Sequence, residues 1–209
     1  MKKRAVAILL MVVIILCVAG VGVKEYLTFP EYEMTESIAF AQSLGRGWNL
    51  GNTLEACEKH STEKAGLESE TTWGNPYTTK VLIAFVKECG FDSIRIPVTW
   101  AQHLGDVPDY TIDKAWLDRV NQVVDWALEC DLKVIINVHH DDAFWLITDN
   151  ANKEKTELIL NKLWSQLCLR FKDYDERLVF DLMNEPRVEG AEGEWQGTEE
   201  WRKVVNELN

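Results

Sequence analysis

The chain contains four short apolar segments, and each is followed by a stretch in which apolar residues recur at helical spacing. The segments are rich in β-branched residues and are the expected strands, at 47–51, 92–97, 133–139 and 177–184. Helices are expected at 34–44, 78–89, 113–130 and about 152–172, and a last one begins near Thr198. The order of elements is therefore a helix followed by four strand–helix units.

Local signals support these helix boundaries. The helix at 113–130 has five apolar residues on one face, namely Trp116, Val120, Val123, Val124 and Ala127. Asp113 is a suitable N-cap for it, because its side chain can accept a hydrogen bond from a free backbone N–H. Gly90 follows the helix at 78–89 and suits the left-handed position just after a helix.

Strand–helix alternation predicts parallel strands, and nearly continuous apolar strands predict a sheet covered on both faces. A doubly wound sheet and a closed barrel both satisfy this pattern. No strand is followed by GxGxxG or GxxxxGK[ST], which argues against the best-known nucleotide-binding versions. The choice between the two folds therefore depends on where the polar residues lie.

Each expected strand carries unusual polar residues at or just beyond its C-terminal end: Asn49 and Asn52, then Arg95, then His139 and His140, then Asn184 and Glu185. In a (β/α)8 barrel all strand C-termini open onto one face, where catalytic residues gather. Taken singly, Arg95 can be a buried ion-pair partner and His139 a core histidine. Taken together they favour an α/β (β/α)8 TIM barrel, of which this chain holds about the first four βα units.

The N-terminus has the form of an export signal. Residues 1–4 are Met-Lys-Lys-Arg, and residues 5–23 are apolar or glycine without interruption. The run is long for a cleaved signal and just long enough to span a bilayer, so a cleaved signal and an uncleaved anchor both remain open. Either places the rest outside the cytoplasm, since the basic residues favour the inner side. We expect 1–33 to be signal or anchor plus linker, and an extracellular or cell-surface protein.

Composition narrows the classes of function. The net charge is −12, which argues against nucleic-acid binding, because contacts with phosphates need basic patches. No cysteine pair has CxxC spacing, so a zinc or redox motif is not supported, and we expect buried free thiols at Cys89, Cys130 and Cys168. Nine tryptophans exceed what a core of this size needs, and some are candidates for stacking on sugar rings.

The most specific motif is the strand that runs into Asn184-Glu185-Pro186. Pro186 ends the strand because it cannot donate to the sheet, which leaves Glu185 at the strand tip. Glycoside cleavage commonly uses two carboxyl groups, one protonated to supply the leaving oxygen and one ionised. A neighbouring carboxylate or partial burial raises the pKa of the first carboxyl group, and a guanidinium such as that of Arg95 keeps the second ionised.

The sequence resembles glycoside hydrolase family 5, most closely its endoglucanase and xyloglucanase branch. The similarity covers residue 34 to the end and rests on GWNLGNTLEA (47–56), TTWGNP (71–76), GFDSIRIPVTW (90–100), VIINVHHDD (134–142), FKDYDERLVFDLMNEPR (171–187) and EWQGTEEWRKVVNELN (194–209). The resemblance implies a retaining endo-hydrolase of β-1,4-glucan that needs no cofactor or metal. Its substrate is cellulose, mixed-linkage glucan or xyloglucan, and a mannan or xylan remains an alternative.

The resemblance also implies roles for individual residues. Glu185 is expected to be the acid/base and Asn184 to contact the sugar 2-hydroxyl. Arg95 is expected to hydrogen-bond the nucleophile, and His139 to line the subsite of the cleaved bond with support from His140. Further substrate contacts are expected at Trp145, Trp73 and, more weakly, Asn52.

The family's nucleophile is a glutamate at the end of the seventh strand, which lies beyond the last expected strand of this sequence. Glu55 and Glu70 lie in a loop and are poor substitutes for it. We therefore expect 34–209 to be the N-terminal half of a catalytic barrel, inactive by itself.

Two other classes of function remain. A non-catalytic carbohydrate-binding protein would use the aromatic residues but has no need of a protonated carboxyl group. A metal enzyme would use His139, His140, Asp141 and Asp142, but adjacent residues on a strand point to opposite faces, and the four are too close in sequence for ordinary zinc geometry.

Overall fold

The computed structural model describes residues 34–59, 61–188 and 199–209. The chain divides into two compact units, Met1–Ala41 and Gln42–Asn209. Helix α2, Glu36–Ser43, runs across this boundary and buries none of its residues. The export signal or anchor expected at 1–33 lies outside the described residues. Among the residues that are described, no helix has the length and apolar character needed to cross a bilayer.

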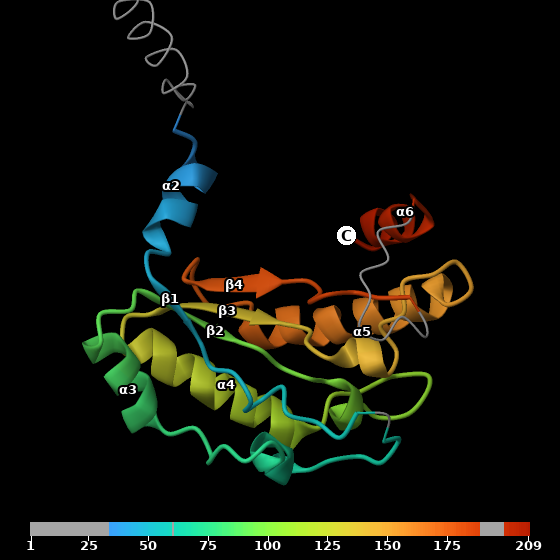
Figure 1. Ribbon diagram of the computed structural model, residues 1–209, viewed down its shortest axis with the longest axis horizontal. Coiled ribbons are helices and arrows are strands. Elements are labelled where there is room, and N and C mark those ends of the chain that lie inside the picture. The colour runs from blue at the N-terminus through green and yellow to red at the C-terminus, as the bar shows by residue number, and fades with distance from the viewer. Residues whose placement is uncertain (1–33, 60, 189–198) are drawn as a thin grey trace, which may run out of the picture. The chain divides into compact units, whose positions relative to one another are not determined.

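The second unit is built on four parallel strands, β1 Gly47–Asn49, β2 Ser93–Ile96, β3 Lys133–Asn137 and β4 Leu178–Asp181. They are hydrogen-bonded in chain order, β1-β2-β3-β4 (Figure 1). The register aligns Trp48, Ile94, Val134 and Leu178 in one row across the sheet. The predicted strands and their parallel arrangement are therefore confirmed.

Four helices follow the strands, α3 Lys80–Glu88, α4 Lys114–Glu129, α5 Lys153–Phe171 and α6 Glu199–Leu208. Their ends are stabilised as expected. The Asp113 carboxylate accepts a hydrogen bond from Trp116 N at 2.9 Å, and the Thr79 hydroxyl accepts one from Leu82 N at 3.2 Å. Gly90 adopts φ +85° after α3, in the left-handed region that favours glycine.

The core lies between one face of the sheet and α3, α4 and α5, which lie along the same side of the strands (Figure 1). Ile94, Val134 and Leu178 of the apolar row are buried there, with all five predicted core residues of α4, while Trp48 at the edge of the row is half-buried. The alternate row, Arg95, Ile135 and Val179, is only partly buried. In the described part of the chain, helices thus cover one face, not both as expected. Chain-order strands with helices on one side are the arrangement of a barrel wall and not of a doubly wound sheet.

The strands end earlier than the apolar pattern predicted. Pairing of β3 stops at Asn137 and that of β4 at Asp181, two and three residues before His139 and Asn184. Single backbone bonds continue the alignment, with His139 N donating to Val98 O and Asn184 N to Val138 O. The regular backbone pairing of the strands therefore ends where the polar side chains converge.

The cysteine prediction was partly wrong. The four cysteines of the described region are free thiols, as expected, but only Cys57 is buried. Cys89 and Cys168 are exposed and Cys130 is half-buried, because they lie at helix ends or on the outer side of α5.

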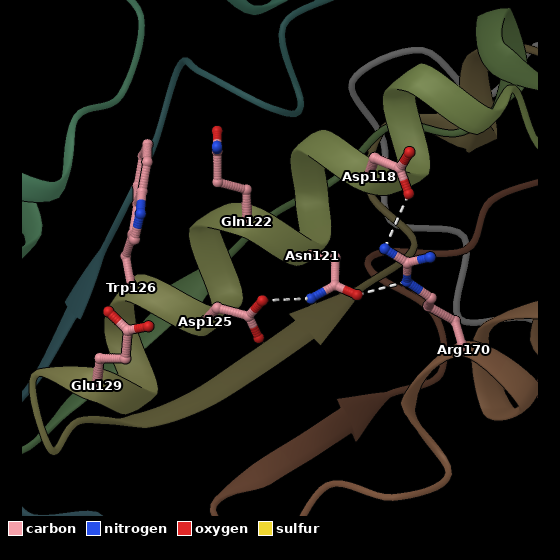
Figure 2. A pocket seen from close by; sticks show the side chains of 7 residues that line it. All are labelled: Asp118, Asn121, Gln122, Asp125, Trp126, Glu129 and Arg170. Atoms are coloured by element: carbon pink, nitrogen blue, oxygen red, sulfur yellow. Dashed lines mark hydrogen bonds and ion pairs between the residues drawn. The ribbon is translucent and has the colours of Figure 1, made fainter.

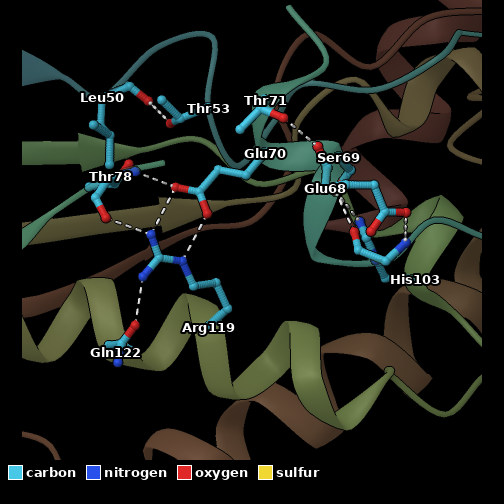
Figure 3. A network of polar contacts seen from close by, with 11 residues as sticks. Leu50, Thr53, Glu68, Ser69, Glu70, Thr71, Thr78, His103, Arg119 and Gln122 are labelled. Carbon is cyan, nitrogen blue, oxygen red and sulfur yellow. Dashed lines mark hydrogen bonds and ion pairs between the residues drawn. The ribbon is translucent and has the colours of Figure 1, made fainter. Parts of the chain in front are cut away.

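A buried ion pair fixes the long loop between β1 and α3 to helix α4 (Figure 3). Glu70, in the short helix η1 (Leu67–Thr71), is 0% exposed. Arg119 donates to both of its carboxylate oxygens, at 2.8 and 2.9 Å, and also to Thr78 O. Thr78 N in turn donates to Glu70. Glu70 therefore has a structural role in holding this loop.

A pocket of about 270 Å³ is lined by residues of α4 and by Arg170 of α5 (Figure 2). Arg170 bridges Asp118 and Asn121 across it, and Asn121 Nδ2 donates to Asp125 at 2.8 Å. These polar links join the two helices, so we assign the pocket a packing role.

We predict that Arg119→Met destabilises the protein by about 3–5 kcal/mol, because it leaves the buried Glu70 charge without a partner. Urea unfolding followed by far-UV circular dichroism measures the loss. The control is Lys114→Met, which removes an exposed pair with Asp118 and should leave the midpoint unchanged. Equal midpoints for the two variants would show that the buried pair does not hold the loop.

Candidate active site

Three of the predicted residues meet at the C-terminal edge of the sheet. Arg95, on β2, donates from Nη2 to Asn184 Oδ1 at 2.8 Å, and the same nitrogen lies 3.5 Å from His139 Nδ1. The three side chains come from the ends of three successive strands. The structure thus brings Arg95, His139 and Asn184 into one cluster, as the barrel hypothesis requires.

Two further polar residues belong to this cluster and were not predicted. Asn137 Nδ2 donates to Asp181 Oδ2 at 3.3 Å and lies 3.2 Å from His139 Nδ1, while Arg95 Nη2 lies 3.4 Å from Asp181 Oδ2. A signal for them exists in the sequence: both are polar residues inside apolar strands. Since side chains two apart share a face, Asn137 lies on the same side as His139, and Asp181 is its register partner.

Glu185 follows Asn184 at the tip of β4 and has an unusual backbone. Its φ of +41° is in the left-handed region, which is uncommon for residues other than glycine and is concentrated at functional sites. Neighbouring contacts hold it there: Asn184 N donates to Val138 O, and Trp201 Nε1 of α6 donates to Pro186 O at 2.9 Å. The carboxylate is partly exposed and accepts a hydrogen bond from Arg187 at 2.9 Å.

The two adjacent histidines lie beside this edge with their ring centroids 4.4 Å apart. Burial lowers the pKa of His139 to about 3, with His140 and Arg95 adding to the effect. Burial and Lys59 lower the pKa of His140 to about 4, although Glu185 opposes this. Both rings are therefore neutral at ordinary pH and can donate and accept hydrogen bonds to hydroxyl groups.

The two tryptophans predicted as sugar platforms have different surroundings. Trp73 is 36% exposed, and its ring packs edge-on against His140 with centroids 5.3 Å apart, while its Nε1 donates to Cys57 O. Trp145 is only 7% exposed, and its Nε1 donates to Asp141 Oδ1 at 2.7 Å. Trp73 thus has a surface beside the site, whereas most of the Trp145 side chain lies in the core. The stacking role of Trp145 stays a prediction.

Asn52 is exposed in the loop after β1 and adopts a left-handed φ of +59°. Its backbone N donates to Glu55, whose other carboxylate oxygen accepts a hydrogen bond from Thr53 N at 3.0 Å. The buried Glu55 therefore organises this loop.

The residues of the metal hypothesis separate in the structure. Asp141 turns inward, where it accepts hydrogen bonds from Trp100 N and Trp145 Nε1, and burial raises its pKa to about 7. Asp142 instead pairs with Arg187 at 3.5 Å. Across 34–59, 61–188 and 199–209, no group of three or more His, Cys, Asp or Glu side chains is arranged to hold a metal ion.

This edge of the sheet offers a cation, two neutral imidazoles, amide groups and two partly exposed carboxylates, those of Asp181 and Glu185. Such a set can bind hydroxyl groups and transfer a proton to a bound oxygen atom. A neutral polyhydroxylated ligand fits this chemistry.

Known proteins are similar to this chain in sequence and in fold. The family model described as "Cellulase (glycosyl hydrolase family 5)" matches residues 57–209. Endoglucanase A of Ruminococcus albus is 49% identical over 164 residues, which are 78% of this chain and 43% of that protein.

Two solved structures are similar as well. A GH5-4 broad specificity endoglucanase from Ruminococcus champanellensis, with bound cellotriose, has a TM-score of 0.78 at 42% identity, covering 87% of this chain and 52% of that one. A GH5 xyloglucan-specific endo-β-1,4-glucanase from a metagenomic library, in complex with cellotriose, has a TM-score of 0.75 at 44% identity, covering 83% and 51%. The chain thus spans about half the length of these solved relatives.

We predict that the ring protons of His139 and His140 titrate near pH 3 and pH 4 in the folded protein. Burial disfavours the charged imidazolium, so the unfolded chain binds more protons below pH 6.5, and this contribution to stability falls as the pH drops from 6.5 toward 3. Proton NMR of histidine-labelled protein measures the midpoints, and His139→Asn assigns the signals. In 8 M urea both midpoints should return to about 6.5. Midpoints of 6 or above in the folded state would contradict the buried placement.

Proposed function

Because this chain belongs to the cellulase family, glycosyl hydrolase family 5, we propose that it carries the acid/base side of the active site of an endo-acting retaining β-1,4-glucanase. One observation carries the proposal: the hydrogen bond from Arg95 to Asn184, which joins the ends of β2 and β4 directly beside Glu185. Arg95 and Asn184, which are far apart in the sequence, are therefore neighbours in space.

Each residue of the site has a part in the proposed mechanism. Glu185, when protonated, gives its proton to the glycosidic oxygen as the bond to the sugar breaks, and as a carboxylate it later takes a proton from water. Asn184 offers an amide to the sugar 2-hydroxyl. Arg95 presents a guanidinium toward the place of the second carboxylate and favours its ionised form. His139 and His140, both neutral, line the subsite of the cleaved bond.

We propose that the second carboxylate, the nucleophile, is not among these 209 residues. Of the glutamates in the loop before α3, Glu55 and Glu70 are buried, and both are bound to structural partners. A retaining enzyme needs its two carboxyl groups about 5 Å apart. The solved relatives are about twice as long as the part that this chain matches, which leaves room for a nucleophile on a later strand.

The proposed substrate is a β-1,4-linked glucan such as cellulose, mixed-linkage glucan or xyloglucan. The names of the two solved relatives, one of broad specificity and one specific for xyloglucan, support this class, and both contain cellotriose. A neutral glucan is not repelled by the charge of −12. Trp73, partly exposed beside His140, is the tryptophan best placed to stack on a glucose ring. We also propose that the protein is extracellular or lies at the cell surface, exported or anchored by residues 1–33.

We predict that the purified 209-residue chain does not hydrolyse carboxymethylcellulose, lichenan or xyloglucan, whereas the intact barrel that contains it does. Reducing-sugar release measures both. In the intact barrel, Glu185→Gln should lower kcat on glucan by about 10²–10⁴-fold. Measurable turnover by the 209-residue chain that is lost in its own Glu185→Gln variant would show that the second carboxylate lies within it.

The Glu185→Gln variant also distinguishes hydrolysis from the alternative function, that of a non-catalytic carbohydrate-binding protein. Unchanged cellotriose affinity in Glu185→Gln, with no activity in any intact form, would support binding alone. Isothermal titration calorimetry with cellotriose provides the affinity.

A further inference from the structure

Arg187 lies between two carboxylates at the edge of the candidate site. Its Nη2 donates to Glu185 Oε2 at 2.9 Å, and its Nε lies 3.5 Å from Asp142 Oδ2. Asp142 follows β3 and Glu185 follows β4, so one guanidinium joins the tips of two neighbouring strands. Charged pairs of this kind are stronger and better oriented than neutral hydrogen bonds.

The backbone of Arg187 is held independently of its side chain. Its carbonyl oxygen accepts hydrogen bonds from both Thr148 N at 2.8 Å and Thr148 Oγ1 at 2.9 Å, and Thr148 is 0% exposed. Residues 147 and 187 also form a parallel β-bridge. Because the core fixes Thr148, the position from which the guanidinium reaches Glu185 is fixed as well.

Asp142 supplies a second anchor that does not depend on the charge of Glu185. Its side chain is largely buried, and burial raises its pKa while the nearby Arg187 opposes that shift. When Glu185 is protonated and the ion pair to it weakens, the attraction of Asp142 still holds the guanidinium in place. When Glu185 has lost its proton, the guanidinium is already aligned with the new carboxylate.

We propose that Arg187, held by Asp142 and Thr148, is a positioning residue that orients Glu185 and stabilises its carboxylate form after proton transfer. This inference rests on the proposed function of Glu185 as acid/base. In that step the proton passes from Glu185 to the leaving oxygen, the C–O bond breaks with its electron pair on that oxygen, and the second carboxylate takes up the sugar carbon. In this proposal Arg187 acts through Glu185, and not by direct contact with the sugar or the leaving group.

The first test concerns placement and needs no activity. The positive charge of Arg187 lowers the pKa of His140, whereas Glu185 raises it. In the intact protein, Arg187→Gln should therefore raise the NMR titration midpoint of His140 by a few tenths of a pH unit. The matched control is Arg177→Gln, an arginine at the opposite end of β4 that pairs with Asp175. An unmoved His140 midpoint in Arg187→Gln would overturn the placement.

The second test compares two leaving groups in the intact enzyme. In a glucan the departing sugar hydroxyl is a poor leaving group that needs the proton, whereas the dinitrophenolate of a dinitrophenyl cellobioside departs without one. The constant to compare is kcat/KM, because it reports the step in which the leaving group departs and not the later step in which Glu185 acts as base. Arg187→Gln should lower kcat/KM on lichenan about ten- to a hundredfold, and lower it on the aryl substrate less than threefold. Arg187→Lys should recover part of the loss, and Arg177→Gln should behave as the unsubstituted enzyme.

Equal losses of kcat/KM on both substrates would mean that Arg187 is only structural and would overturn the inference. Failure of the proposed function has a different signature. In that case Glu185→Gln itself loses no more activity on lichenan than on the aryl substrate, while the shift of the His140 midpoint in Arg187→Gln persists.

Discussion

Parallel pairing of the four strands in chain order is the constraint on which the remaining features depend. Because β1 to β4 run in one direction and in register, their C-terminal ends share one edge. Residues more than eighty positions apart, such as Arg95 and Asn184, thereby come within hydrogen-bonding distance. The apolar rows packed against α3, α4 and α5 hold this alignment, since a shift of one residue would turn them away from the core.

The polar cluster at this edge is stable because its groups satisfy one another. Arg95 has acceptors in Asn184 and Asp181, and Asn137 donates to Asp181. A guanidinium left half-buried without such partners would cost the fold several kcal/mol. The network also limits where each side chain can point, which is the preorganisation that a catalytic site requires. The same principle explains the left-handed Glu185, whose neighbours hold a backbone conformation that is unfavourable by itself.

Much of the fold was predictable from local signals. Apolar spacing located all four strands and their helices, and Asp113 and Gly90 marked helix ends as expected. Arg95, His139, Asn184 and Glu185 were found because polar residues at the ends of apolar strands are conspicuous. Asn137 and Asp181 were missed because they lie inside the strands as expected from the sequence, at 133–139 and 177–184, although they are the last residues of β3 and β4 in the structure. Their importance depends on register partners in the neighbouring strand. The strand ends were also overestimated, since apolar composition continues for two or three residues beyond the last backbone pair.

The sequence by itself determined the elements, their order, the acidic surface and the residue types at each strand end, because these follow from periodicity and chemical identity along the chain. Only the tertiary structure decided which of those residues touch and which are enclosed. It separated exposed Trp73 from buried Trp145, turned Asp141 into the core while Asp142 faces Arg187, and showed Glu55 and Glu70 bound to structural partners. The physical reason is that burial and pairing depend on neighbours brought in by other strands and helices, and no local pattern in a single segment specifies them.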